Sequence, residues 1–149
     1  MAQFEIGPHQ VQLEDDIFLV RWRDNNPELG PLVQVYERLA RFIAERGYAL
    51  ALFDLHLAGI PSNELRRYAG QWVRQQRPNT LVVASYGMSK PLQALMSLIS
   101  RALALFQGPG PALTALFSTE SEARAWLEAQ RARLAAENVG NSSPIGRSG

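Results

Sequence analysis

The sequence predicts an α/β fold in which a mixed β-sheet of about five strands is flanked by four α-helices. Three observations support this class. Short apolar runs alternate with longer segments in which apolar residues recur at helical spacing. The central run, residues 49–55, is apolar on both faces as far as Asp54, as expected for a strand covered by helices. The helical segments end near Gly or Pro before the next apolar run begins.

The first part of the chain is expected to form a β-meander. Residues 4–6 and 10–13 alternate apolar and polar side chains, as half-buried strands do. Residues 17–22 form a longer strand after the turn at Asp15 and Asp16. One face of this strand should carry Phe18, Val20 and Trp22, and the other Ile17, Leu19 and Arg21.

A loop at residues 24–31 leads to the first helix, whose apolar stripe covers residues 32–43. Gly47 is placed to end this helix, because glycine adopts the left-handed conformation that follows many helices. The strand at residues 49–55 comes next, and a second helix follows it until Pro78 stops it. The apolar stripe of that helix consists of Leu65, Tyr68, Ala69, Trp72 and Val73.

Two further strands and two further helices complete the predicted fold. Residues 80–84 form a buried-type strand, residues 91–106 a third helix closed by a Gly/Pro loop at 108–111, and residues 112–117 the last strand. A capping box at residues 119–122 opens the final helix, in which Ala123, Trp126, Leu127 and Leu134 form the buried stripe.

One domain is expected over residues 1–137, with a disordered Gly- and Ser-rich tail at residues 138–149. The chain has 149 residues and a formal net charge of +1, so no strong electrostatic field would favour binding to nucleic acid or to an anionic membrane. It contains no cysteine, which excludes disulfides and thiol catalysis. No signal peptide or transmembrane segment is predicted, and a cytoplasmic location is expected.

The residues do not point to an enzyme, a metal site or a cofactor. Asp54 and His56 should leave the same face of their strand, and Ser85 or Ser89 could complete a Ser-His-Asp arrangement. However, the segment between these serines lacks the Gly-x-Ser-x-Gly elbow, and no oxyanion donor can be identified. With His9 as the only other histidine, a zinc site is not expected.

The order of elements resembles the STAS domain, the anti-sigma-factor-antagonist fold, and more specifically the SpoIIAA-like group of bacterial STAS/SEC14-type proteins. The resemblance covers residues 4–130. It is carried by Val-Gln-Leu-Glu-Asp-Asp-Ile-Phe-Leu-Val-Arg-Trp22, by Leu-Phe-Asp-Leu55 followed by Gly59-Ile-Pro-Ser62, and by Phe117-Ser-Thr-Glu-Ser-Glu-Ala-Arg-Ala-Trp-Leu127.

This resemblance implies a STAS-like (SpoIIAA-like) regulatory module that acts through protein–protein interaction. In phosphorylated STAS proteins a strand ends in Asp, and a hydroxyl at the start of the next helix is modified, which breaks docking. Asp54 matches the acid and Ser62 lies near the place of the hydroxyl, although residues 61–64 lack the acid and the glycine around it. The implied regulatory or partner-binding residues are Asp54, His56, Ser62, Asn63 and Glu64. Alternatively, Ser62 is simply the N-cap of the second helix, worth about 1 kcal/mol.

The third helix is apolar beyond a single stripe, because Leu98 and Leu105 fall outside the face formed by residues such as Met96. Such a helix is deeply buried in the core, forms a homodimer face, or lines an apolar ligand pocket. The last possibility leaves a second function open, a SEC14-like carrier of a lipid or other small apolar ligand. The interface or ligand wall would consist of Tyr86, Met96, Leu98, Arg101 and Leu105.

A nucleic-acid surface is not expected on the second helix, although it carries several arginines. Tyr68 and Trp72 fall on the same helical stripe as Leu65, so they should be buried rather than available for stacking on bases.

Overall fold

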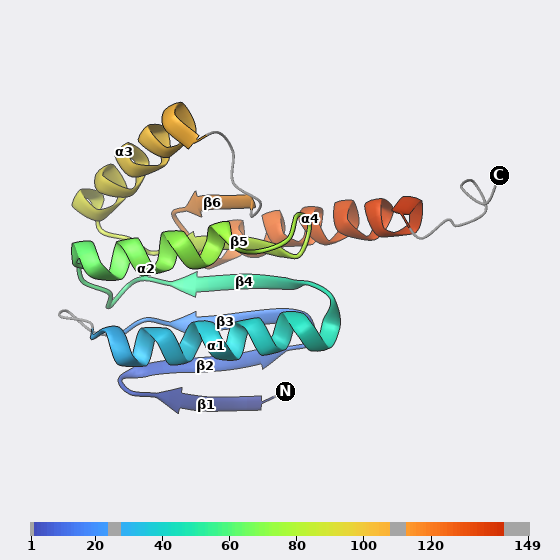
Figure 1. Cartoon of the computed structure of the whole chain (residues 1–149). Helices are drawn as coiled ribbons and strands as arrows, with labels where there is room; N and C mark the ends of the chain where they lie inside the picture. Colours follow the sequence, from blue (N-terminus) through green and yellow to red (C-terminus); the bar gives the residue numbers. More distant parts are fainter. Residues whose placement is uncertain (1, 24–27, 108–112, 142–149) are drawn as a thin grey trace.

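The computed structural model describes residues 2–23, 28–107 and 113–141, and at 99–100, 102–107 and 138–141 it describes the backbone alone. Six strands form one mixed sheet in sequence order, and four helices accompany it (Figure 1), which confirms the predicted α/β class. The elements are β1 (Ala2–Ile6), β2 (His9–Glu14), β3 (Ile17–Arg21), α1 (Leu29–Arg46), β4 (Ala49–Asp54), α2 (Asn63–Arg74), β5 (Leu81–Tyr86), α3 (Lys90–Gln107), β6 (Leu113–Phe117) and α4 (Glu120–Asn141).

The sheet has six strands rather than about five, because β1 pairs with β2 as a separate edge strand that is also longer than the alternation at residues 4–6 indicated. Ala2 pairs with Leu13 and Ile6 with His9, so β1 follows β2 along almost its whole length. Both hairpins of the meander have two-residue turns, and Gly7 and Asp15 take the positive φ angles of 59° and 53° that such turns require. The neighbouring pairs β3–β4, β4–β5 and β5–β6 are parallel, so the sheet is mixed, as predicted.

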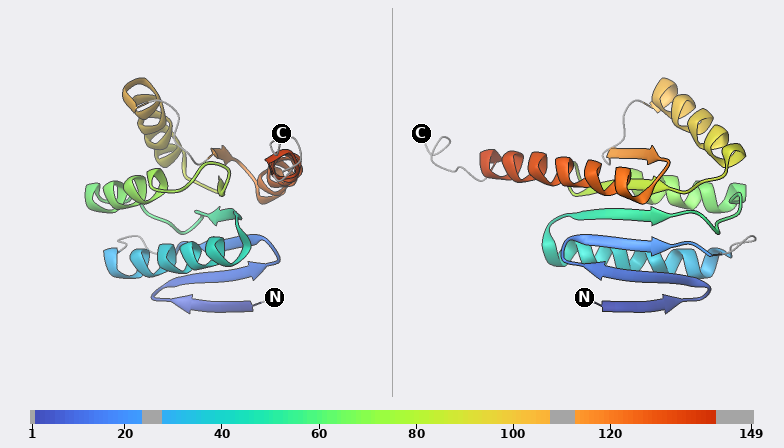
Figure 2. Two further views of the ribbon diagram at one scale, coloured as in Figure 1. Left: turned by 45° about the vertical axis from the view of Figure 1, so that its right-hand side comes forward. Right: turned by 180° about the vertical axis from the view of Figure 1, so that it is seen from behind.

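The helices divide between the two faces of the sheet (Figures 1 and 2). α1 and α2 cover one face, and α4 crosses β4, β5 and β6 on the other. This division follows from right-handed crossovers, which place the helices of successive parallel units on one side. α3 lies on the side of α1 and α2 but extends beyond β6 in every view.

Two apolar clusters hold these layers together. The cluster under α1 and α2 contains Phe18, Val20 and Trp22, and the cluster under α4 contains Ile17 and Leu19, so the predicted faces of β3 are confirmed. Tyr68 and Trp72 lie at the edge of the first cluster, where both rings contact Tyr36, at centroid distances of 6.0 and 4.7 Å. The stripe on α2 therefore packs against the core, as expected.

The predicted ends of three helices are also confirmed. Gly47 follows α1 with a φ of 88°, and its N–H donates to the Ile43 carbonyl at 2.7 Å. Thr119 and Glu122 form the capping box of α4, because each side chain accepts a hydrogen bond from the other residue's N–H at 3.2 Å. Ser62 is the N-cap of α2.

The C-terminal boundary differs from the prediction. α4 continues to Asn141, so residues 138–141 belong to the helix and not to a tail. Extending a helix by one residue costs much less free energy than nucleating a helix. α4 can therefore continue through Asn138 and Gly140 although both residues have low helix propensity. The rest of the expected tail (142–149), the loop expected at 108–111 and residues 24–27 of the loop expected at 24–31 lie outside the described residues. Residues 29–31 of that expected loop belong to α1 instead. Within the described part of the chain, no helix is both long and apolar enough to cross a membrane.

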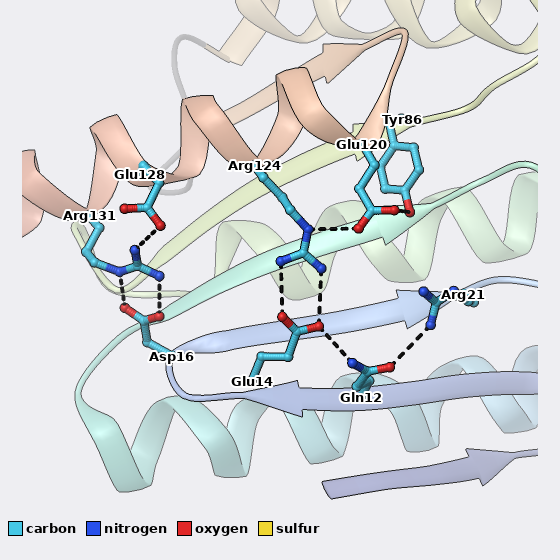
Figure 3. A network of polar contacts seen from close by, with 9 residues as sticks. All are labelled: Gln12, Glu14, Asp16, Arg21, Tyr86, Glu120, Arg124, Glu128 and Arg131. Carbon is cyan, nitrogen blue, oxygen red and sulfur yellow. Dashed lines mark hydrogen bonds and ion pairs between the residues drawn. The ribbon is translucent and has the colours of Figure 1, made fainter. Parts of the chain in front are cut away.

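A network of charged side chains attaches α4 to the meander (Figure 3). Arg124 binds both carboxylate oxygens of Glu14, at 3.0 and 3.2 Å, and also Glu120 at 2.8 Å. Arg131 binds both carboxylate oxygens of Asp16, at 2.7 and 2.6 Å. Since Glu14 ends β2 and Asp16 lies in the β2–β3 turn, the two bidentate pairs fix the angle of α4 across the sheet.

Asp16 should make the stability of the fold depend on pH. Burial raises the pKa of its carboxyl, but hydrogen bonds from Arg131 and from Tyr48 (2.7 Å), with the charge of Arg131, outweigh burial and lower it. A pKa that is lower in the folded state stabilises the fold above the unfolded value of about 4, and this stabilisation is lost as pH falls through the folded pKa.

We expect Asp16→Asn to reduce the free energy of unfolding by about 1–2 kcal/mol at pH 7. Between pH 7 and pH 3 the free energy of unfolding of the variant should decrease less than that of the wild type. Urea titrations followed by circular dichroism at several pH values measure both effects. Asp15→Asn is the matched control, because Asp15 is exposed in the same turn and Asn tolerates its positive φ. Equal pH profiles for wild type and Asp16→Asn would contradict the assignment.

Candidate functional site

Three side chains form a row at the carboxyl ends of the parallel strands. The register pairs Arg21 of β3 with Asp54 of β4, and Asp54 with Tyr86 of β5. Residues paired in this way have side chains on the same face of a sheet, here the face that carries α4. A cation, a carboxylate and a phenol are therefore adjacent where the β4 strand ends.

Asp54 organises the loop that follows β4. Its Oδ1 accepts hydrogen bonds from the His56 backbone N–H at 3.0 Å and from His56 Nδ1 at 2.8 Å. Its Oδ2 lies 3.6 Å from Arg21 Nε. Because an ionised carboxylate only accepts hydrogen bonds, this contact favours the tautomer of His56 in which Nδ1 carries the proton. The His56 side chain as a whole is 63% exposed.

Tyr86 and Gly87 support His56 from the neighbouring strand. The rings of His56 and Tyr86 meet edge to face at 5.8 Å. Gly87 has a φ of 81°, and a Cβ there would lie 2.7 Å from His56 Nδ1, so only glycine leaves room for the imidazole.

The Tyr86 hydroxyl donates to Glu120 at the start of α4, at 3.1 Å. Burial raises the pKa of this phenol, and the charges of Asp54 and Glu120 raise it further, so Tyr86 remains a hydrogen-bond donor at neutral pH. This bond connects the row at the strand ends to α4 and its ion pairs (Figure 3).

A hollow of about 150 Å³ opens beside Asp54 and His56. Its other lining residues come from the end of β3 and from the β4–α2 loop: Arg21, Trp22, Arg23 and Leu57. A larger hollow, of about 570 Å³, lies at the opposite end of β3, but charged side chains that pair with one another, such as Asp16 and Arg131, line most of it.

The predicted partner-binding residues separate into two groups. Asp54 and His56 contact each other at the hollow, whereas Ser62, Asn63 and Glu64 lie at the start of α2 and do not line it. Ser62 Oγ accepts a hydrogen bond from Leu65 N–H at 3.2 Å, which confirms the N-cap. All three residues of the second group are exposed.

The predicted interface on the third helix is brought together only in part. Tyr86 is buried in the cluster under α4, whereas α3 lies on the other side of the sheet (Figure 2), so Tyr86 does not share a wall with Met96. Leu98 and Arg101 are exposed and Met96 is half-buried, while the side chain of Leu105 lies outside the described residues.

The serine positions required for a triad are not available. Ser85 is paired with Phe53, whose side chain belongs to the cluster under α1 and α2, so it points away from the face of Asp54. Ser89 Oγ accepts a hydrogen bond from Leu92 N–H at 3.4 Å at the start of α3. Among the described residues, no group of three His, Asp or Glu side chains could hold a metal ion.

Sequence reasoning did not identify Arg21, Gly87 and Glu120 as parts of this site. The parallel register that places Arg21 beside Asp54 cannot be read from either strand alone. Glu120 lies 34 residues from Tyr86, and only its position within the capping segment drew attention to it. Comparisons of the chain with protein-family models and with curated proteins find no match.

Proposed function

We propose that the protein is a non-enzymatic, STAS-like regulatory module that docks another protein at the carboxyl edge of its sheet. One observation carries this proposal: Leu57 and Ile60 are 62% and 56% exposed within the single loop that follows Asp54 and His56. Two large exposed apolar side chains in one loop, of which Leu57 lines the preformed hollow, are typical of a protein-binding surface.

The charges around the hollow favour an acidic group on the partner. Arg21 and Arg23 contribute two guanidinium groups, against the single carboxylate of Asp54. The Arg23 Nη2 atom donates to the Gln10 side-chain oxygen at 3.0 Å, a neutral acceptor that leaves the positive charge in place. The expected partner therefore presents a carboxylate beside an apolar side chain, which would contact the hollow and Leu57 together.

Ser62 provides a position at which docking could be regulated. Its hydroxyl is exposed and caps α2, so a phosphate attached there would lie at the positive end of the helix dipole. It would also add negative charge to the loop that carries Leu57 and Ile60, and so repel an acidic partner. We propose modification of Ser62 as the means of control over docking.

Affinity capture from the native host tests the docking surface. Wild type and Leu98→Ser should recover the same partner, because Leu98 is equally exposed but lies on α3. The double variant Leu57→Ser/Ile60→Ser should bind the purified partner at least tenfold more weakly in calorimetry, a loss of about 1.4 kcal/mol. Unchanged affinity of the double variant would refute the proposal. The proposed phosphorylation of Ser62 is tested by measuring the intact mass of the protein purified from its native host. Ser62→Ala is the control and should lack the mass of the phosphate.

The carrier function remains a second prediction without a structural observation in its favour. Neither of the two hollows described above is formed by α3.

A further inference from the structure

The outer edge of β6 has no strand partner in the part of the chain that the structure describes. β6 pairs with β5 on one side, and no described strand pairs with its other side. Its five residues, Leu-Thr-Ala-Leu-Phe117, include no charge and no proline, and Leu113 and Leu116 are 43% and 39% exposed. Edge strands normally carry charges, prolines or bulges that prevent pairing with another chain. The opposite edge follows this rule, since Glu5 of β1 is exposed.

α3 makes the same region more apolar. Leu116 is paired with Ser85 and Thr114 with Val83, so Thr114 and Leu116 face the side of the sheet that carries α1 and α2. α3 belongs to that side, yet it extends past the β6 edge (Figures 1 and 2) and leaves Leu116 uncovered. Leu98 on α3 is 66% exposed.

We propose that two copies of the chain form a symmetric dimer in which their β6 strands pair antiparallel. A two-fold axis through Ala115 sets Leu113 opposite the partner's Phe117 and Thr114 opposite the partner's Leu116. Every opposed pair is then uncharged and mostly apolar, which is the favourable case for cross-strand contacts. The backbone groups along the free edge would gain hydrogen-bond partners, and the two sheets would become one.

The position of α3 is the reason to assign a second copy to this edge. A two-fold axis perpendicular to the sheet keeps equivalent faces on the same side. Each α3 therefore extends over the other copy's β6, above Thr114 and Leu116, and the two α3 helices run past each other in opposite directions. A five-residue strand alone buries much less than the roughly 800 Å² per partner of a standard interface, and α3 supplies further area.

A disulfide across the axis is a direct test, because the chain contains no cysteine of its own. In antiparallel strands, opposed Cα atoms lie about 4.5–5.5 Å apart, within the range that a disulfide spans. Ala115→Cys should therefore form a covalent dimer quickly under mild oxidation. Gln3→Cys, at the exposed β1 edge, is the matched control and should cross-link at least tenfold more slowly.

Size-exclusion chromatography with light scattering completes the test. Wild type should be a dimer, and Leu116→Glu and Leu98→Glu should each weaken it at least tenfold while circular dichroism remains unchanged. A monomeric wild type, or equal cross-linking of Ala115→Cys and Gln3→Cys, would overturn the proposal. A dimer sensitive to Leu98→Glu but not to Leu116→Glu would also overturn it, because contact would then involve α3 alone. None of these residues lies in the docking surface of the proposed function, so the two proposals can fail separately.

Discussion

Replacing Leu52 with alanine is expected to lower the free energy of unfolding by about 3–4 kcal/mol. Leu52 is completely buried in β4, paired with Leu19 of β3 and Ala84 of β5 beneath α4. Its removal loses apolar burial and leaves a cavity between the sheet and Leu127 of α4, where regular backbone on both sides resists collapse.

Urea unfolding followed by circular dichroism measures this loss. Leu57→Ala is the matched control, because it removes the same atoms from a side chain that is 62% exposed. We expect that variant to change stability by less than about 0.5 kcal/mol. Similar losses for the two leucines would contradict the central position of β4.

Gly87→Ala is expected to destabilise the fold by about 2–3 kcal/mol and to release His56 from Asp54. Alanine in the left-handed region costs about 1–2 kcal/mol. In addition, its Cβ would lie 2.7 Å from His56 Nδ1, so the imidazole has to move, and its hydrogen bond to Asp54 is lost at a cost of about 1 kcal/mol. The change should therefore alter the candidate site without touching its other members.

Gly47→Ala separates the two causes. Gly47 has a similar φ of 88°, but no heavy atom lies within 4 Å of the position of a Cβ, so this variant carries the backbone strain alone. Nuclear magnetic resonance should show a changed His56 imidazole environment in Gly87→Ala and an unchanged one in Gly47→Ala. Identical His56 spectra in wild type and Gly87→Ala would mean that the glycine does not hold the ring in place.

Local patterns in the sequence were sufficient to predict most elements and their buried faces. Alternation in residues 17–22 assigned Phe18 and Leu19 to opposite faces of β3, and the structure confirms both. Caps at Gly47 and Thr119 were equally predictable, because each depends on residues within a few positions along the chain. The full length of β1 was not predictable from the sequence. Ala2 and Gln3 belong to the strand because they pair with β2, and they show no alternating pattern of their own.

The candidate site was predicted only where its contacts are local. Asp54 and His56 are two residues apart, and the turn that follows β4 brings the His56 N–H and ring to Asp54 Oδ1. Arg21, Tyr86 and Glu120 join them through the parallel register and the path of α4, which depend on the packing of the whole domain. The apolar excess of α3 was visible in the sequence, but its position beyond β6 is a property of the tertiary structure.

The sequential order of β3, β4, β5 and β6 has a consequence for the shape of the carboxyl edge. Ligand crevices in open parallel sheets arise where neighbouring strands send their connections to opposite faces. Here α1, α2 and α3 follow β3, β4 and β5 toward one face, whereas α4 follows β6 onto the other, so the connections diverge between β5 and β6. The switch point of this sheet therefore lies between β5 and β6, beside Tyr86 and one strand away from Asp54.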